Sequence, residues 1–139
     1  MIDKENCHIL IIREKLHALL SERILKDSGY TNVYTASSSK HALSIIEKIT
    51  PDLIFLDYRQ AKDEPTGIEL FNQLKRFPAL KNTAFLIYVA RLPQDLYEEI
   101  KELGFAGLIL MPMGYDELVQ ACEALLSGGT YFRDFNEYW

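Results

Sequence analysis

The sequence predicts an α/β fold in which a parallel five-stranded sheet lies between two layers of helices. Short apolar runs without polar alternation recur along the chain, as in strands that are buried on both faces. Longer stretches with apolar residues at helical spacing separate these runs, which is the order of strands joined by helical crossovers. A length of 139 residues suits one domain with a core of its own.

The first half of the chain holds three expected strands and two expected helices. In chain order they are a strand over His8–Ile12, a helix over 14–26, a strand over Asn32–Ala36, a helix from the Ser37–Ser39 cap to Ile49 and a strand over 53–56 that ends at Asp57. The apolar positions of the first helix recur at helical spacing. They are Leu16, Leu19, Leu20, Ile24 and Leu25.

The second half repeats this order after a polar loop over residues 58–66. Its expected elements are a helix over 67–76, a strand over 84–89, a helix from Pro93 to Leu103, a strand over 107–110 and a helix over 115–126. Five strands that alternate with five helices predict a flavodoxin-like (βα)5 three-layer sandwich with strand order 2-1-3-4-5.

We expect residues 1–127 to form the domain and residues 128–139 to form an aromatic tail or an extension of the last helix. The tail aromatics are Tyr131, Phe132, Phe135, Tyr138 and Trp139. Three options follow: packing on the domain or on a partner, a linker to an output domain, or a disordered segment, which the cost of exposing aromatic surface disfavours. No helix-turn-helix follows the tail, so we do not expect the chain itself to read DNA.

Composition excludes several classes of function. Fifteen Lys and Arg against twenty Asp and Glu give a net charge of −5, which argues against a nucleic-acid binder. No apolar run reaches the roughly 18 residues of a membrane span, and the first six residues are too polar for a signal peptide, so we expect a cytoplasmic protein. Cys7, Cys122 and three scattered histidines show no zinc-ligand spacing.

Functional groups in open α/β sheets gather at the carboxyl ends of the strands. The sequence places Arg13 and Glu14 after the first strand and Asp57 after the third. It places Val89 at the end of the fourth strand and Met111-Pro112 after the fifth.

These positions and their flanks resemble the receiver domain of response regulators, also called the CheY-like domain, from His8 to Ser127. The run PDLIFLD, which ends at Asp57, is similar to the segment that ends in the family's phospho-acceptor aspartate. The runs GIEL at 67–70 and GLILMP at 107–112 resemble two further family segments. The 22 positions from Val89 to Met111 fit the family's spacing between a hydroxyl residue and a lysine.

The resemblance implies a two-component signalling module that accepts a phosphoryl group from a histidine kinase. In working members, two acids after the first strand and the acceptor aspartate hold Mg²⁺, whose hard character favours carboxylate oxygens. A Ser or Thr and the lysine then bind the phosphoryl oxygens. An aromatic residue on the fifth strand carries the change to the face formed by the fourth helix, fifth strand and fifth helix.

Carried over residue by residue, most of these parts are substituted. Arg13 and Glu14 fall on the acidic pair, so a cation replaces the first carboxylate. Val89 falls on the hydroxyl position, Met111 on the lysine and Leu108 on the switch aromatic.

Only Asp57, Glu14 and Pro112 remain of the family's set. The family's equivalent of the Met111-Pro112 bond is cis, so we expect that isomer here. The interval from Asp57 to Gly67 is two residues longer than usual.

The charges indicate a degenerate receiver, or pseudo-receiver. A working pocket has three carboxylates and one lysine, a formal −2, whereas Asp57, Glu14 and Arg13 sum to −1. At ~4 Å and an effective dielectric of about 20, one misplaced unit charge against a dication costs several kcal/mol. We therefore expect no metal, no cofactor and no catalytic residue. Two options stay open for Arg13, a bond to Asp57 or a solvent-facing side chain, and two for Asp57, a vestigial or a live acceptor.

Our first hypothesis is a phosphorylation-independent protein–protein interaction module. Its partner would be a histidine kinase, another regulator or a second copy, as in a homodimer, bound through the fourth helix, fifth strand and fifth helix or through the first helix. The alternative is an atypical phospho-receiver in which Glu14 and Asp57 hold Mg²⁺. An enzyme or flavin carrier is disfavoured because residues 13–15 hold no Gly, Ser or Thr to cradle a phosphate.

Overall fold

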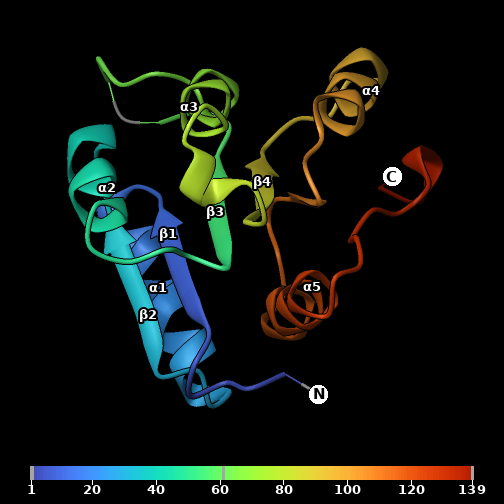
Figure 1. Ribbon diagram of the computed structural model, residues 1–139. Helices are drawn as coiled ribbons and strands as arrows, with labels where there is room; N and C mark the ends of the chain where they lie inside the picture. Colours follow the sequence, from blue (N-terminus) through green and yellow to red (C-terminus); the bar gives the residue numbers. More distant parts are fainter. Residues whose placement is uncertain (1, 61, 139) are drawn as a thin grey trace.

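The computed structural model describes residues 2–60 and 62–138. Its strands all pair in parallel, in the order β2-β1-β3-β4-β5, which confirms the predicted fold class (Figure 1). The strands are β1 (His8–Ile12), β2 (Asn32–Ala36), β3 (Leu53–Asp57), β4 (Ala84–Val89) and β5 (Gly107–Leu110). The α-helices are α1 (Lys15–Asp27), α2 (Ser39–Ile46), α3 (Gly67–Leu74), α4 (Gln94–Leu103) and α5 (Tyr115–Leu126).

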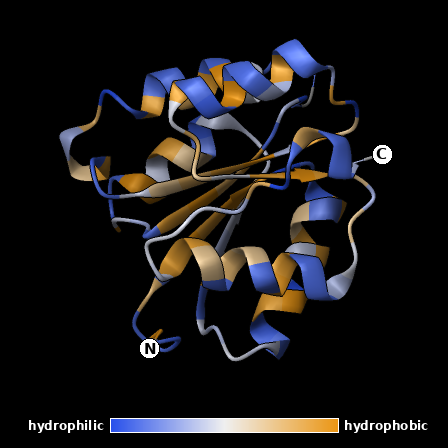
Figure 2. Cartoon of the chain, turned by 90° about the vertical axis from the view of Figure 1, so that its right-hand side faces the viewer, coloured by the Kyte–Doolittle hydropathy of each residue, from blue (hydrophilic) through white to orange (hydrophobic). Residues whose placement is uncertain are grey.

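Alternation along each strand divides the core into two halves. Ile9 and Ile11 point to the face covered by α1 and α5, whereas Leu10 and Ile12 point to the face covered by α2, α3 and α4. Figure 2 shows the resulting layers, with hydrophobic strands between helices that carry hydrophilic outer faces. This division decides which side chains meet at the strand ends.

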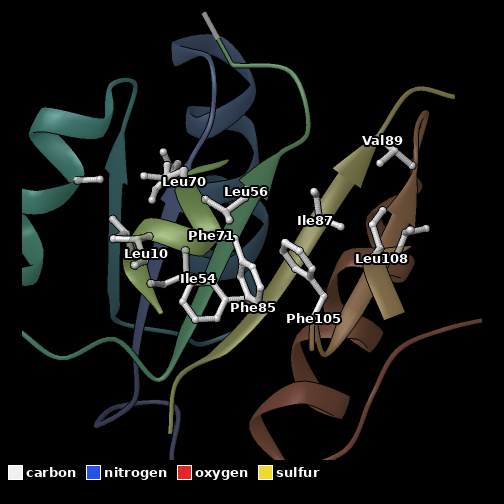
Figure 3. Close-up of a cluster of buried hydrophobic side chains, with 14 of the residues drawn as sticks. Leu10, Ile54, Leu56, Leu70, Phe71, Phe85, Ile87, Val89, Phe105 and Leu108 are labelled. Carbon is white, nitrogen blue, oxygen red and sulfur yellow. The ribbon is translucent and has the colours of Figure 1, made fainter. Parts of the chain in front are cut away.

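Three phenylalanines pack among aliphatic side chains in the half of the core under α3 and α4 (Figure 3). Phe71 of α3 stacks on Phe105 with 3.9 Å between ring centroids and meets Phe85 of β4 edge-on at 5.0 Å. This packing holds α3 against the sheet, with its first residue, Gly67, next to the end of β3.

The structure ends α3 two residues earlier than the sequence predicts, at Leu74 instead of residue 76. Pro78 follows closely and disfavours helical geometry at Phe77, whose backbone is extended. At the other end, Thr66 and Glu69 form a capping box that begins the helix.

Helix α1 lies in its predicted place but turns three of its leucines outward. Leu16, Leu19 and Leu20 are 71%, 45% and 65% exposed, whereas the buried positions are Ala18, Ser21 and Leu25. A stripe of apolar residues at helical spacing normally marks the buried face of a helix. Here small residues let α1 lie close to the sheet, so the leucines form an exposed stripe, which we call the α1 stripe.

The chain beyond α5 packs on the domain, which was the first of the three options for the tail. Residue Tyr131 forms a parallel bridge with Gly107, and a 3-10 helix over Phe135–Tyr138 follows. Tyr138 is buried against the ring of Tyr97. Trp139 lies outside the described residues. None of the helices in the described part of the chain is long and apolar enough to cross a membrane.

Candidate functional site at the carboxyl ends of the strands

Strand alternation and register bring four residues to one place above the sheet. Arg13 follows β1 directly and keeps the alternation of Ile9 and Ile11, so its side chain enters the α1 side. Asp57 ends β3 and is paired in register with Tyr88 of β4, which packs in the same half of the core. Met111, just after β5, also packs on that side.

The Arg13 guanidinium is the centre of this site, because each of its nitrogens has a partner. Its Nε donates to Oδ1 of Asp57 over 2.8 Å, and its Nη1 donates to Oγ of Ser21 over 3.0 Å. Its Nη2 lies 3.8 Å from Sδ of Met111. The guanidinium carbon lies 3.8 Å from the ring centroid of Tyr88, a cation–π contact, and Arg13 is only 2% exposed. The first of the two options for Arg13, a bond to Asp57, is therefore what the structure shows.

Asp57 is the anionic half of a buried ion pair. Burial raises the pKa of its carboxyl above the ordinary value, and the charge and hydrogen bond of Arg13 act in the opposite direction. Its side chain keeps 14% of its surface exposed at the strand end. The pair thus joins one positive and one negative charge where working receivers gather negative charge for a dication.

Glu14 does not add its carboxylate to this pair. Its two oxygens accept hydrogen bonds from the backbone N–H groups of Leu16 at 3.2 Å and His17 at 3.4 Å, which caps α1. Within residues 2–60 and 62–138, no group of three or more His, Cys, Asp or Glu side chains could hold a metal ion. The donor set as folded does not fit a resident Mg²⁺.

Val89 and Leu108 lie apart from the ion pair. Both are buried, at 1% and 0% exposure, in the half of the core under α4 (Figure 3), which is on the opposite face of the sheet from the contacts of Arg13 with Ser21 and Tyr88. The Met111–Pro112 peptide bond is cis, the isomer expected from the resemblance. Of the substituted positions, the structure therefore brings only Met111 into contact with Arg13.

The loop after Asp57 is held at both ends. Gln60 donates from Nε2 to the carbonyl oxygen of Asp57 over 2.8 Å, and Glu64 accepts from the backbone N–H of Ser39 over 2.6 Å. Gly67 lies so close to Asp57 that a Cβ there would overlap the Asp57 carbonyl oxygen. The longer loop thus reaches α2 and supplies part of the cap of that helix.

Two residues of the site, Ser21 and Tyr88, were not anticipated from the sequence. Tyr88 could have been found from alternation, because it occupies the β4 position beside the last residue of β3. Ser21 had no such signal, since a serine in a helix is ordinary and only the docking angle of α1 turns it toward Arg13.

The sheet order, the acceptor-type aspartate at the end of β3 and the cis proline after β5 define a receiver-like signalling module. The chain belongs to the response regulator receiver domain family, whose model matches residues 9–123. It is thus a receiver domain of the kind found in two-component response regulators. Receiver domains are in general signalling modules that interact with histidine kinases and other regulators, and they use Mg²⁺ when phosphorylated.

Curated relatives cover this chain along most of its length. Sporulation initiation phosphotransferase F of Bacillus subtilis is 30% identical over 123 residues, which are 87% of this chain and 94% of that protein. The transcriptional regulatory protein DegU of Brevibacillus brevis is 26% identical over 137 residues, 95% of this chain but 55% of that protein. The chain therefore spans about half the length of this second relative.

Solved receiver domains share the fold. The non-phosphorylated receiver domain of the stress response regulator RcsB from Escherichia coli superposes with a TM-score of 0.80 at 16% identity, over 94% of this chain and all of that one. The chemotaxis response regulator CheY4 of Vibrio cholerae gives 0.76 at 22% identity, over 86% of this chain and 98% of that one.

Proposed function

We propose that this chain is a cytoplasmic, non-enzymatic receiver that works without phosphorylation, metal or cofactor and acts by binding a protein partner. The observation that carries the proposal is the buried Arg13 guanidinium bound to the carboxylate of Asp57. The Arg13 guanidinium supplies the positive charge that a working receiver takes from Mg²⁺. Because this charge belongs to the chain, it is always present beside Asp57.

The contacts around Arg13 make this substitution hard to reverse. A dication beside Asp57 would meet the guanidinium at short range, and at ~4 Å and an effective dielectric of about 20 each such repulsion amounts to several kcal/mol. Moving Arg13 away would break its bonds to Asp57 and Ser21 and its contact with the Tyr88 ring. Asp57 therefore stays in one charge-paired conformation.

The residues that would bind a phosphoryl group and respond to it are also substituted. Val89 offers no hydroxyl, Met111 no ammonium group and Leu108 no aromatic ring, and the first and last of these are packed in the core. A phosphoryl group on Asp57 would therefore lack the hydroxyl and ammonium ligands of the family, and the change would lack the aromatic residue that carries it further.

The partner surface that we propose is the α1 stripe. Leu16, Leu19 and Leu20 are exposed on the outer side of α1. The other face that we considered, formed by α4, β5 and α5, is partly covered, because residues 130–138 pack on Tyr97 and on the edge of β5. A kinase, another regulator or a second copy would thus bury leucines on α1, each worth about 1.5–3 kcal/mol when fully buried.

Beryllofluoride, a phosphoryl mimic, tests the proposal in the presence of Mg²⁺. We expect no change in the amide NMR spectrum at millimolar concentrations of both. A saturable shift that is lost in Asp57→Asn would overturn the proposal.

Arg13→Asp provides the converse test. It restores a carboxylate at the first acidic position, so Mg²⁺ affinity measured by calorimetry should rise by about 100-fold or more. Arg76→Asp makes the same charge change at an exposed residue that follows the C-terminal end of α3, whereas it is the N-terminal end of that helix that lies against Asp57, and it should leave Mg²⁺ affinity close to that of the wild type.

A second candidate, an atypical phospho-receiver, has one observation in its favour. Asp57 is still partly exposed at the end of β3, where an acceptor must be reached. In that case Glu14 would leave the N-terminus of α1 to join Asp57 at Mg²⁺. Transfer of radiolabelled phosphate from a histidine kinase to the wild type, and not to Asp57→Asn, would select this candidate.

A further inference from the structure

The C-terminal segment, residues 130–138, adds a short extension to the edge of the sheet. The backbone N–H of Tyr131 donates to the carbonyl of Ala106 over 2.8 Å, and the N–H of Leu108 donates to the carbonyl of Tyr131 over 3.0 Å. Strand β5 is the last strand in the sheet order, so these backbone groups belong to an edge. Open strand edges pair readily with other chains, and proteins commonly cover them.

Side chains of the C-terminal segment also join the two helices that flank this edge. The ring of Tyr97 in α4 meets those of Phe132, Phe135 and Tyr138 at 5.5–6.3 Å between centroids. Its hydroxyl donates to the carbonyl of Arg133 over 2.6 Å. The segment runs from α5 toward α4 in Figure 1, so it connects the two helices across the edge of β5.

An ion pair ties the middle of the C-terminal segment to α5. The guanidinium of Arg133 lies 2.8 Å from Oε2 of Glu117, which also accepts from the hydroxyl of Tyr131 at 3.3 Å. Gly128, before the segment, has a φ of +86° and open space where a Cβ would lie. The C-terminal segment thus follows a glycine with positive φ and is held on the domain by a strand bridge, an aromatic cluster and an ion pair.

We propose that the C-terminal segment is an intrachain cap that keeps the edge of β5 from pairing with a second copy of the chain. When the cap is lifted, the carbonyl of Ala106 and the N–H of Leu108 lose their partners, and the ring of Tyr97 loses three aromatic neighbours. A second copy offers the same backbone groups and the same ring, so two such edges are self-complementary. The cap normally prevails because its tether gives it a high effective concentration, of the order of millimolar.

The test loosens the cap from its own side and leaves the body of the domain unchanged. Tyr131→Pro removes the N–H that bonds to Ala106, and Tyr138→Ala removes the buried end of the cluster. In the full-length double variant, studied at a concentration low enough to keep it monomeric, we expect hydrogen exchange at the Leu108 amide to be about tenfold faster or more. Sedimentation velocity should show a dimer that grows with concentration. Asn136→Ala, an exposed change within the segment, is the matched control and should match the wild type.

A peptide of residues 130–138 added in excess should bind the double variant and return it to the monomer, because it fills the uncovered edge. Faster exchange without association, or unchanged exchange, overturns the proposal. If the double variant fails to fold, Arg133→Glu decides, since it places two like charges together at a partly buried pair on the surface of α5 and should shift the same two measurements.

This proposal stands apart from the one for α1. A dimer formed through the α1 stripe would already be present in the wild type and would not respond to the peptide. Binding of beryllofluoride would overturn the proposed function but would say nothing about the cap. Hydrogen exchange at the Leu108 amide tests the cap separately.

Discussion

Arg13 and Asp57 lie 44 positions apart in the chain, and their side chains form an ion pair of 2.8 Å in which the arginine is almost fully buried. A buried charge that keeps its partner is tolerated, whereas one that loses its partner is strongly destabilising. The pair therefore holds β1, β3 and α1 together at the point where an active receiver would bind a metal ion.

Removal of the guanidinium should lower stability markedly. We expect Arg13→Ala to reduce the free energy of unfolding by about 3–5 kcal/mol, because Asp57 then remains buried without its cation. Urea denaturation followed by circular dichroism measures this change. Arg91→Ala, at an exposed arginine, should stay within about 0.5 kcal/mol of the wild type. A loss below about 1 kcal/mol in Arg13→Ala would mean that the pair is not a structural element.

The pKa of Asp57 sets a pH dependence of stability. Burial raises this pKa above the ordinary 3.8, so the folded protein holds the proton more tightly than the unfolded chain. The contribution of Asp57 to stability should therefore fall as the pH rises through 3.8 to the folded pKa and stay level above it. NMR titration of the Asp57 carboxyl carbon should give a midpoint above 3.8. Arg13→Met should raise that midpoint further, and a lower midpoint in this variant would contradict the assignment of Arg13 as its counter-ion.

Gly67 should be intolerant of a side chain because of its contact with Asp57. A Cβ at this position would overlap the Asp57 carbonyl oxygen and press on the backbone of Tyr58. Backbone cannot move aside as a flexible side chain can, so Gly67→Ala should cost about 1–3 kcal/mol in thermal or urea unfolding. Gly114→Ala is the matched control, since nothing lies within 4 Å of its Cβ position. Equal stability of the two variants would show that the loop adjusts freely.

The α1 stripe should contribute to binding and little to folding. Leu16→Ser and Leu20→Ser remove exposed side chains, so we expect stability to change by less than about 0.5 kcal/mol. Leu25→Ala, on the buried side of the same helix, should cost about 2–5 kcal/mol. Binding to a histidine kinase or regulator partner, measured by calorimetry, should weaken in the two serine variants. Retained affinity in both would place the partner elsewhere.

The strands were the most predictable part of the fold. Residues 8–12, 84–89 and 107–110 form strands over the predicted ranges, because strands buried on both faces appear as uninterrupted apolar runs bounded by polar residues. The orientation of α1 was less predictable. Its stripe of leucines indicates an apolar face but does not say that this face lies away from the sheet.

The site was anticipated in part, since Arg13, Asp57 and Met111 were placed at the carboxyl ends of strands, and Arg13 does contact both of the others. Val89 and Leu108 were grouped with them through the resemblance, yet strand alternation directs both to the opposite core. Ser21 and Tyr88 complete the surroundings of Arg13 and came to light only in the structure.

By itself, the sequence determined the order of strands and helices, the parallel sheet and the replacement of an acidic residue by Arg13, since these depend on local pattern and residue type. Only the tertiary structure decided that Arg13 turns inward to Asp57, that the leucines of α1 face outward and that residues 130–138 close the edge of β5. These three outcomes depend on strand register and helix docking, which arise from packing among segments far apart in the chain and are not fixed by the local order of the amino acids.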